Sequence, residues 1–166
     1  MDGKDAMQTT ARSDSRLTYD DFVLFPDDGL RHEIIDGVHY VTPSPTIRHQ
    51  RMSRRLFFAL ESYLQDNPSA GEVFFARLDV VMSHWDVVEP DLLLVAGDQT
   101  DLLTEKNVQG APALVIEILS PGTRKRDEQI KRQLFERSGA RVLAGGSAAQ
   151  PDRGLSPCRR RLVSES

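Results

Sequence analysis

The stretch Pro-Ala-Leu-Val-Ile-Glu-Ile-Leu-Ser-Pro at residues 112–121 is the most informative part of this chain about its fold. Its apolar run, Ala113 to Leu119, is interrupted by a single acid, Glu117, and such a run is typical of a strand covered on both faces. Ser120-Pro121-Gly122 ends the strand, and the charged segment from Lys125 to about Arg137 is expected to be a helix. A buried strand followed by a helix favours a mixed α/β (α+β) fold.

Two local signals organise the N-terminal part of the chain. Thr18, with Asp21 three residues later, has the spacing of a capping box, so a short helix is expected to follow. The Asp36-Gly37 pair lies between the apolar runs His32–Ile35 and Val38–Val41. It predicts a tight β-hairpin, because both turn positions need positive φ.

The middle of the chain predicts one long helix and one antiparallel pair of strands. From Thr46 to Gln65 apolar residues recur at four-residue spacing, which is the pattern of an amphipathic helix. Glu72–Met82 and Val87–Val95 are extended and apolar, and the turn-forming segment Ser83–Asp86 joins them. There is no internal repeat, and 166 residues suffice for one compact domain with a single core.

Composition is that of an ordinary globular protein, with 39% hydrophobic and 28% charged residues. No apolar run approaches the ~20 residues that span a bilayer, and residues 1–16 are expected to be a disordered leader without the apolar core of a secretory signal. A cytoplasmic protein is expected. The single cysteine, Cys158, excludes an internal disulfide. The net charge of −4 argues against nonspecific coating of nucleic acid.

Two carboxylates occupy strands in which an unpaired buried charge would be costly. Glu117 interrupts one such strand, and Asp91 opens the apolar segment Leu92–Val95. Oxygen ligands on neighbouring strands can share one hard cation, so the pair predicts a Mg²⁺ or Mn²⁺ site. A simpler interpretation makes Asp91 a turn residue after Pro90.

Lys131 lies on the helix that follows the Glu117 strand, four residues after Asp127 and on the same helix face. A lysine here can point toward the cation and stabilise charge on phosphate oxygens. Glu33, on the first strand of the hairpin, can supply a third acid as an outer ligand or a base. The competing interpretation makes Lys131 and Asp127 a surface ion pair.

Two basic clusters can flank a phosphate backbone. One contains Arg48 and Arg51, and the other contains Arg124 and Lys125. Because phosphate binding draws on Arg and Lys, these four residues are candidate nucleic-acid contacts. The alternative is that both clusters are solvated helix faces.

Several motifs, taken in their order and spacing, resemble the Uma-two family of putative restriction endonucleases, a family of the PD-(D/E)xK nuclease superfamily. They are His-Glu-Ile-Ile-Asp-Gly at 32–37, Pro-Ser-Pro-Thr followed by His49, Glu89-Pro90-Asp91, the 112–121 stretch, and Arg126-Asp127 with Lys131. The resemblance covers about Leu17 to Gly139.

The resemblance implies a restriction-endonuclease-like domain whose mixed central sheet is flanked by helices. Within it, Asp91 and Glu117 would bind metal, Glu33 would add an acid, and the lysine of the superfamily motif would have moved onto the next helix as Lys131. His49 and Asp127 are further candidates for supporting roles.

The implied function is metal-dependent hydrolysis of phosphodiester bonds in DNA. A homodimer is expected, because enzymes of this superfamily often pair to cut two strands. Two alternatives stay open: a non-catalytic remnant or binding module that keeps the fold, and a structural partner in a mobile-element or defence complex. Metal binding that depends on Glu117 and Asp91 would distinguish an enzyme from a remnant.

The chain after Gly139 departs from the family, whose members continue into a strand like Arg-Glu-Tyr-Trp-Leu-Val-Asp-Pro. Residues 140–166 show no periodicity and no aromatic residue, so we expect a disordered tail and a domain incomplete at its C-terminus, without its last core strand. Ala140 to Ser147 can be encoded so that the same bases, read one nucleotide later, give the family strand. We therefore interpret the tail as a frameshifted read-through.

Overall fold

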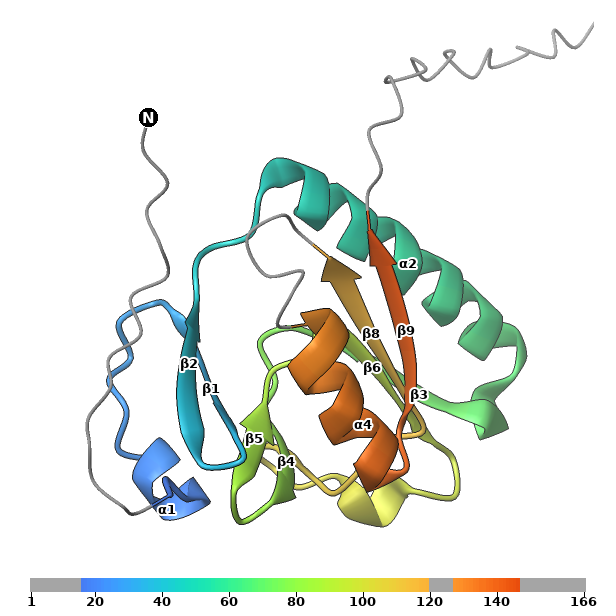
Figure 1. Cartoon of the computed structure of the whole chain (residues 1–166). Coiled ribbons are helices and arrows are strands. Elements are labelled where there is room, and N and C mark those ends of the chain that lie inside the picture. Colours follow the sequence, from blue (N-terminus) through green and yellow to red (C-terminus); the bar gives the residue numbers. More distant parts are fainter. Residues whose placement is uncertain (1–15, 120–126, 147–166) are drawn as a thin grey trace, which may run out of the picture.

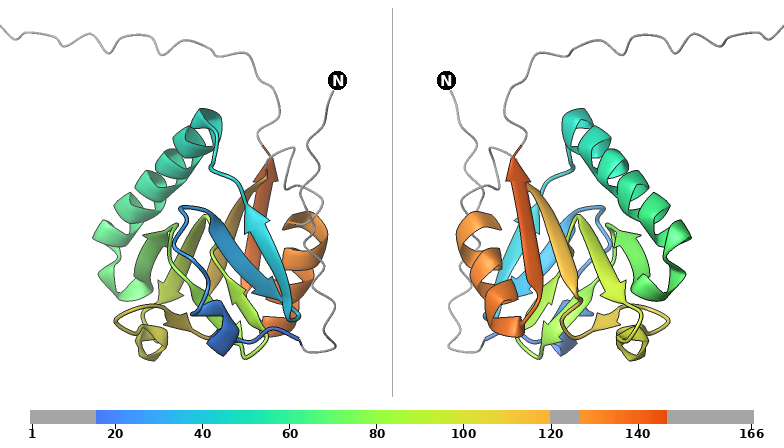
Figure 2. Two further views of the ribbon diagram at one scale, coloured as in Figure 1. Left: turned by 90° about the vertical axis from the view of Figure 1, so that its left-hand side faces the viewer. Right: turned by 90° about the vertical axis from the view of Figure 1, so that its right-hand side faces the viewer.

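The computed structural model describes residues 16–119 and 127–146, which form two mixed sheets with helices on both faces of the second sheet (Figure 1 and Figure 2). The first sheet has the strand order β2-β1-β5-β4-β7, and the second has the order β3-β6-β8-β9. The expectation of a mixed α and β fold is confirmed, although the sheet is divided in two. The predicted leader, apart from Arg16, and residues 147–166 of the predicted tail lie outside the described residues.

The N-terminal elements follow the local signals of the sequence. Helix α1, Tyr19–Phe22, begins at the capping box of Thr18 and Asp21. Strands β1, Arg31–Ile35, and β2, Val38–Thr42, form the antiparallel hairpin. Its turn residues, Asp36 and Gly37, have φ of 53° and 74°. Both predicted elements are confirmed.

The predicted antiparallel pair is present, but it bends so that each strand contributes to both sheets. The elements are β3 (Gly71–Phe75), β4 (Val80–Ser83), β5 (Asp86–Val88) and β6 (Leu92–Ala96). β4 pairs with β5 in the first sheet, whereas β3 pairs with β6 in the second. Pro90 lies at the bend and cannot donate a ladder hydrogen bond, which favours a break in the strand there.

The long helix α2, Ile47–Asp66, confirms the predicted amphipathic helix. Thr46 accepts a hydrogen bond from the His49 N–H and caps its first turn. The apolar side of α2 packs on the second sheet, where its Met52, Leu56, Phe57 and Leu60 contact Leu92, Ile116 and Ile118. Across the described ranges, no helix is both long and apolar enough to span a membrane.

The opposite face of the second sheet carries the other helix, as the two side views show (Figure 2). Strand β8, Leu114–Leu119, leads through residues outside the described ranges to a π-helical segment η3, Asp127–Lys131, and to α4, Arg132–Ser138. Leu134 and Phe135 of α4 pack in the main core, which includes Leu93 and Val115. Alternation along the strands therefore directs odd-numbered residues of β6 and β8 toward α4.

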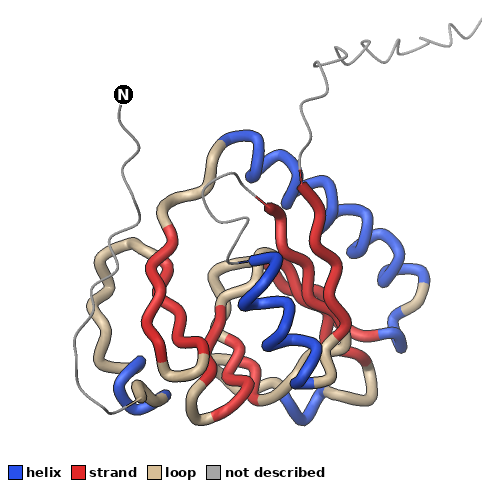
Figure 3. The backbone as a smooth tube through the Cα atoms, in the orientation of Figure 1, coloured by secondary structure: helices blue, strands red, loops and turns tan. Residues whose placement is uncertain are grey.

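The remaining short elements close the chain between these larger ones. They are η1 (Pro68–Ala70), η2 (Thr100–Leu102) and β7 (Val108–Gln109), and β7 runs parallel to β4 at the edge of the first sheet. Figure 3 shows the loops and turns, in tan, that connect the helices and strands.

Strand β9, Arg141–Gly146, overturns one expectation. We predicted no regular structure after Gly139, but these residues pair in parallel with β8 along its whole length. Gly139 ends α4 in the left-handed region, with φ 84°, and turns the chain back along the sheet. Backbone ladder bonds need no particular side chain, and Val142 still packs against the core. The last strand is therefore present, and the frameshift interpretation stays an untested prediction.

Candidate active site

The bend between the two sheets brings the candidate acids together. In the antiparallel pair of β6 and β8, Leu92 lies opposite Ile116 and Leu93 lies opposite Val115. Continuing this register by one residue places Asp91 opposite Glu117, just before the start of β6. The two acids predicted as metal ligands are thus cross-strand neighbours.

Lys131 lies between two of the candidate acids. Its Nζ atom is 2.6 Å from Glu33 Oε1 and 2.8 Å from Glu117 Oε1. Lys131 and Glu33 are fully buried, and Glu117 is 2% exposed. The interpretation of Lys131 as a surface residue is therefore wrong. It ends a π-helical turn, and such turns recur at functional sites.

Asp91 is held by three donors from three elements. Its Oδ1 accepts from Arg31 Nη2 at 3.1 Å, and its Oδ2 accepts from the Ile118 N–H at 2.8 Å and contacts His49 Nε2 at 3.0 Å. Burial raises the pKa of Asp91, but these hydrogen bonds and the Arg31 charge outweigh it and lower the pKa from 3.8 to about 2. Asp91 is therefore ionised at neutral pH.

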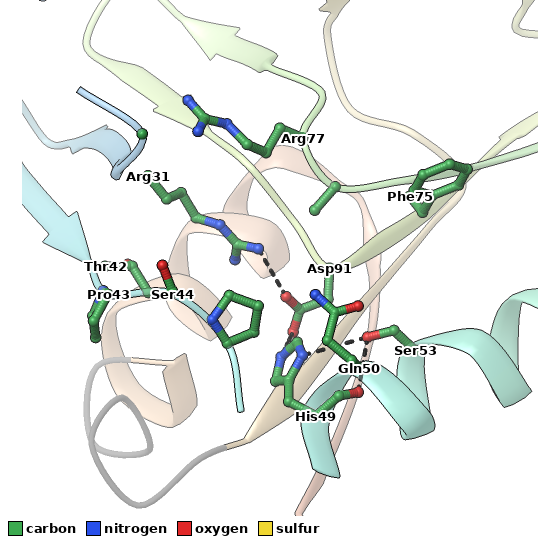
Figure 4. A pocket seen from close by; sticks show the side chains of 13 residues that line it. Arg31, Thr42, Pro43, Ser44, His49, Gln50, Ser53, Phe75, Arg77 and Asp91 are labelled. Carbon is green, nitrogen blue, oxygen red and sulfur yellow. Dashed lines mark hydrogen bonds and ion pairs between the residues drawn. The ribbon is translucent and has the colours of Figure 1, made fainter. Parts of the chain in front are cut away.

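His49 reaches Asp91 from the first turn of α2, where the Thr46 cap fixes the start of the helix. One turn later, Ser53 Oγ donates to the His49 carbonyl at 3.1 Å and lies 3.4 Å from His49 Nδ1. Figure 4 shows this chain of contacts from Ser53 through His49 to Asp91. The structure thus brings the supporting candidate His49 into the site.

Three site residues were not singled out from the sequence: Arg31, Arg77 and Glu89. Arg31 lies two residues before Glu33 on β1, so both side chains point to the same face. Glu89 is 4% exposed, its N–H donates to Glu33 Oε1 at 3.0 Å, and burial raises its pKa from 4.5 to about 7. In the sequence, the only signals that could have identified these residues were the two-residue spacing of Arg31 from Glu33 and the position of Glu89 in the Glu-Pro-Asp motif.

A cavity of about 270 Å³ opens beside Asp91 (Figure 4). Arg31, His49, Ser53 and Arg77 are among its lining residues. Asp91 is therefore the member of the acid cluster that faces a space large enough for a small polar ligand.

The remaining candidates do not join this cluster in the described structure. Arg48 and Arg51 are exposed on α2, and neither lines the cavity. Arg51 borders a separate hollow with Arg54. Asp127 lies in the first turn of η3, with a side chain outside the described structure, and Arg124 and Lys125 fall outside the described residues.

Comparison with known proteins identifies the family and the fold. A family description, Uma2, "Putative restriction endonuclease", matches residues 19–144. A solved structure of a putative nuclease belonging to DUF820 from Anabaena variabilis ATCC 29413 is similar in fold, with a TM-score of 0.64, 18% identity, and coverage of 77% of this chain and 74% of that chain. The comparison with curated proteins found no match. The match over most of its length shows that this chain belongs to the Uma2 family of putative restriction endonucleases.

Proposed function

We propose that this protein is a Mg²⁺- or Mn²⁺-dependent endonuclease that hydrolyses phosphodiester bonds in DNA. The observation that carries the proposal is the buried cluster in which Lys131 bridges Glu33 and Glu117, next in the strand register to Asp91, which lines a cavity. Fully buried charges contribute little net stability, and often none, so a cluster of this kind at a cavity favours a chemical role.

The donor set fits a hard divalent cation. Within the described ranges, no group of three His, Cys, Asp or Glu residues is arranged to hold a metal. Mg²⁺, however, commonly uses one or two carboxylates and completes its shell with water and substrate phosphate. Asp91 Oδ1 accepts one hydrogen bond, from Arg31, and a carboxylate oxygen has a second acceptor site. Asp91 and Glu117 would therefore hold the cation, which would supply Lewis acidity and lower the pKa of an attacking water.

The chain's own residues would position and neutralise the reacting groups. His49 and the Ile118 N–H orient the Asp91 carboxylate, and they also help keep it ionised. Glu33 accepts from the Lys131 ammonium and fixes its position next to Glu117. This contact favours Glu33 as the group that holds Lys131, rather than as a base. Lys131 would then stabilise negative charge that builds on the phosphate oxygens.

A nicking assay on supercoiled plasmid in Mg²⁺ or Mn²⁺ tests the proposal. The unaltered chain should cleave, and Glu117→Ala and Asp91→Ala should abolish cleavage. Glu136→Ala is the matched control, because Glu136 is an exposed glutamate of α4 paired with Arg132. Cleavage that survives both site substitutions would contradict the proposal. No cleavage by the folded protein would favour the non-catalytic remnant. If two chains act together as a homodimer, they would cut both DNA strands. Sedimentation of the active protein would test whether it is a dimer.

A further inference from the structure

The cavity beside Asp91 has two arginines on its wall that the metal chemistry does not use. Arg31 comes from β1, and Arg77 comes from the connection between β3 and β4. Figure 4 shows the guanidinium of Arg31 pointing at Asp91 and Arg77 entering from the connection that follows Phe75. Two segments far apart in the sequence thus place positive charge in one space.

Glu89 lies between the two arginines and forms an ion pair with each of them. Its Oε2 atom lies 3.9 Å from Arg31 Nε and 3.7 Å from Arg77 Nε. The atom is buried and makes no hydrogen bond within the described part of the chain. When ionised, Glu89 therefore attracts both guanidinium groups without filling their hydrogen-bond donors.

Most of the arginine donors in this pair are left for a ligand. A guanidinium has five N–H groups in a planar fork that matches a phosphate. Among the described residues, the one hydrogen bond of the Arg31 guanidinium goes to Asp91, and Arg77 has its ion pair with Glu89 and no hydrogen bond. The Arg31 side chain is 15% exposed and that of Arg77 is 50% exposed, so a ligand in the cavity can reach Arg77.

We propose that Arg31 and Arg77, held side by side by Glu89, form a phosphate clamp that binds a backbone phosphate of the nucleic-acid substrate next to Asp91. The inference rests on the proposed nuclease function and names the residues that hold its substrate. Carboxylates alone would repel a phosphodiester, and the clamp supplies the opposite charge on the cavity wall. We propose the clamp, instead of Arg48 and Arg51, as the phosphate contact at this site, because neither Arg48 nor Arg51 lines the cavity.

Binding measured without cleavage tests the clamp. Fluorescence anisotropy of labelled duplex and single-stranded oligonucleotides in EDTA would give the affinity of the full chain over a range of salt concentrations. Arg77→Ala should weaken binding several-fold and reduce the slope of log K against log salt by about one. Arg77→Lys should restore the slope but only part of the affinity, since an ammonium lacks the planar fork.

Arg132→Ala is the matched control, because Arg132 is 64% exposed and pairs with Glu136 away from the cavity. It should bind like the unaltered chain. Equal affinity and salt slope for Arg77→Ala and Arg132→Ala would overturn the clamp, even if the plasmid assay shows cleavage that depends on Glu117. Inorganic phosphate that binds the unaltered chain while oligonucleotides do not would overturn the nucleic-acid ligand. Binding that depends on Arg77 without any plasmid cleavage would support the clamp and contradict the catalytic proposal.

Discussion

Lys131 and Arg137 lie on the continuous helical segment formed by η3 and α4, and each forms ion pairs with two acidic side chains. Lys131 contacts Glu33 and Glu117, with side chains at most 3% exposed. Arg137 contacts Asp36 in the hairpin turn and Asp86 at the start of β5, and its side chain is 43% exposed. The difference between the two clusters is burial, not chemistry.

That difference in burial separates the structural role of Arg137 from the chemical role that we propose for Lys131. Arg137 makes two hydrogen bonds to the Asp36 carboxylate and fastens the hairpin to the end of α4 at a small cost in lost hydration. The buried charges around Lys131 lose their hydration, and pairs of this kind are often no more stable than apolar residues of the same size. Stability alone therefore gives little reason for the buried cluster, which is consistent with the chemical role that we propose for it.

The largest expected effect comes from removing the buried cation. Lys131→Met leaves Glu33 and Glu117 buried without their ammonium partner, so the free energy of unfolding should fall by about 3–5 kcal/mol. Urea unfolding followed by circular dichroism measures this change.

A matched substitution shows whether the loss comes from uncompensated charge. Replacing Glu33 and Glu117 by Gln together with Lys131→Met removes all three charges, and most of the stability should return. A cost below about 1 kcal/mol for Lys131→Met alone would mean that the cluster is solvated, and the contrast with Arg137 would be lost.

A smaller effect is expected at the exposed cluster. Arg137→Ala should lower the free energy of unfolding by about 1 kcal/mol or less, because surface ion pairs are weak and Asp86 keeps hydrogen bonds from Ser83 and the Asp36 N–H. Plasmid cleavage should be unchanged. A loss of cleavage with intact stability would show that Arg137 also acts on the site.

The smallest effect concerns His39, a half-buried residue of β2 on the hairpin face opposite to Glu33. His39 Nε2 lies 2.9 Å from His32 Nδ1, and His32 contacts Asp28. Burial and the nearby His32 lower the pKa of His39 from 6.5. The unfolded chain therefore takes up this proton first as the pH falls, and stability is lost from pH 6.5 down through the folded-state pKa.

His39→Gln should reduce this acid sensitivity. The fall in Tm between about pH 7.5 and about pH 5.5 should be smaller in the variant than in the unaltered chain. Equal falls in Tm would show that His39 does not titrate differently in the folded and unfolded states.

The sequence predicted the elements whose signals are local. The Asp36-Gly37 turn needs positive φ, α2 follows from its four-residue spacing, and Glu117 stands out because an acid in an apolar strand is rare. Each of these depends on a few neighbouring residues.

Features that depend on distant contacts were missed. The division of the sheet arises where 76–79 and 89–91 bend together, and apolar alternation does not mark where a strand bends. Strand β9 forms by backbone pairing with β8, which composition does not register. Arg31 precedes its apolar run and resembles a solvated residue until Asp91, 60 positions away, is placed beside it.

Titration calorimetry with Mn²⁺, with one acid replaced in each cluster, measures whether the buried acids hold a metal ion. The unaltered chain and Asp36→Asn should bind Mn²⁺ alike, whereas Asp91→Asn should lose binding while circular dichroism shows that its fold is intact. Equal binding by Asp91→Asn and Asp36→Asn, or no binding by the unaltered chain, would contradict a metal site at the buried cluster.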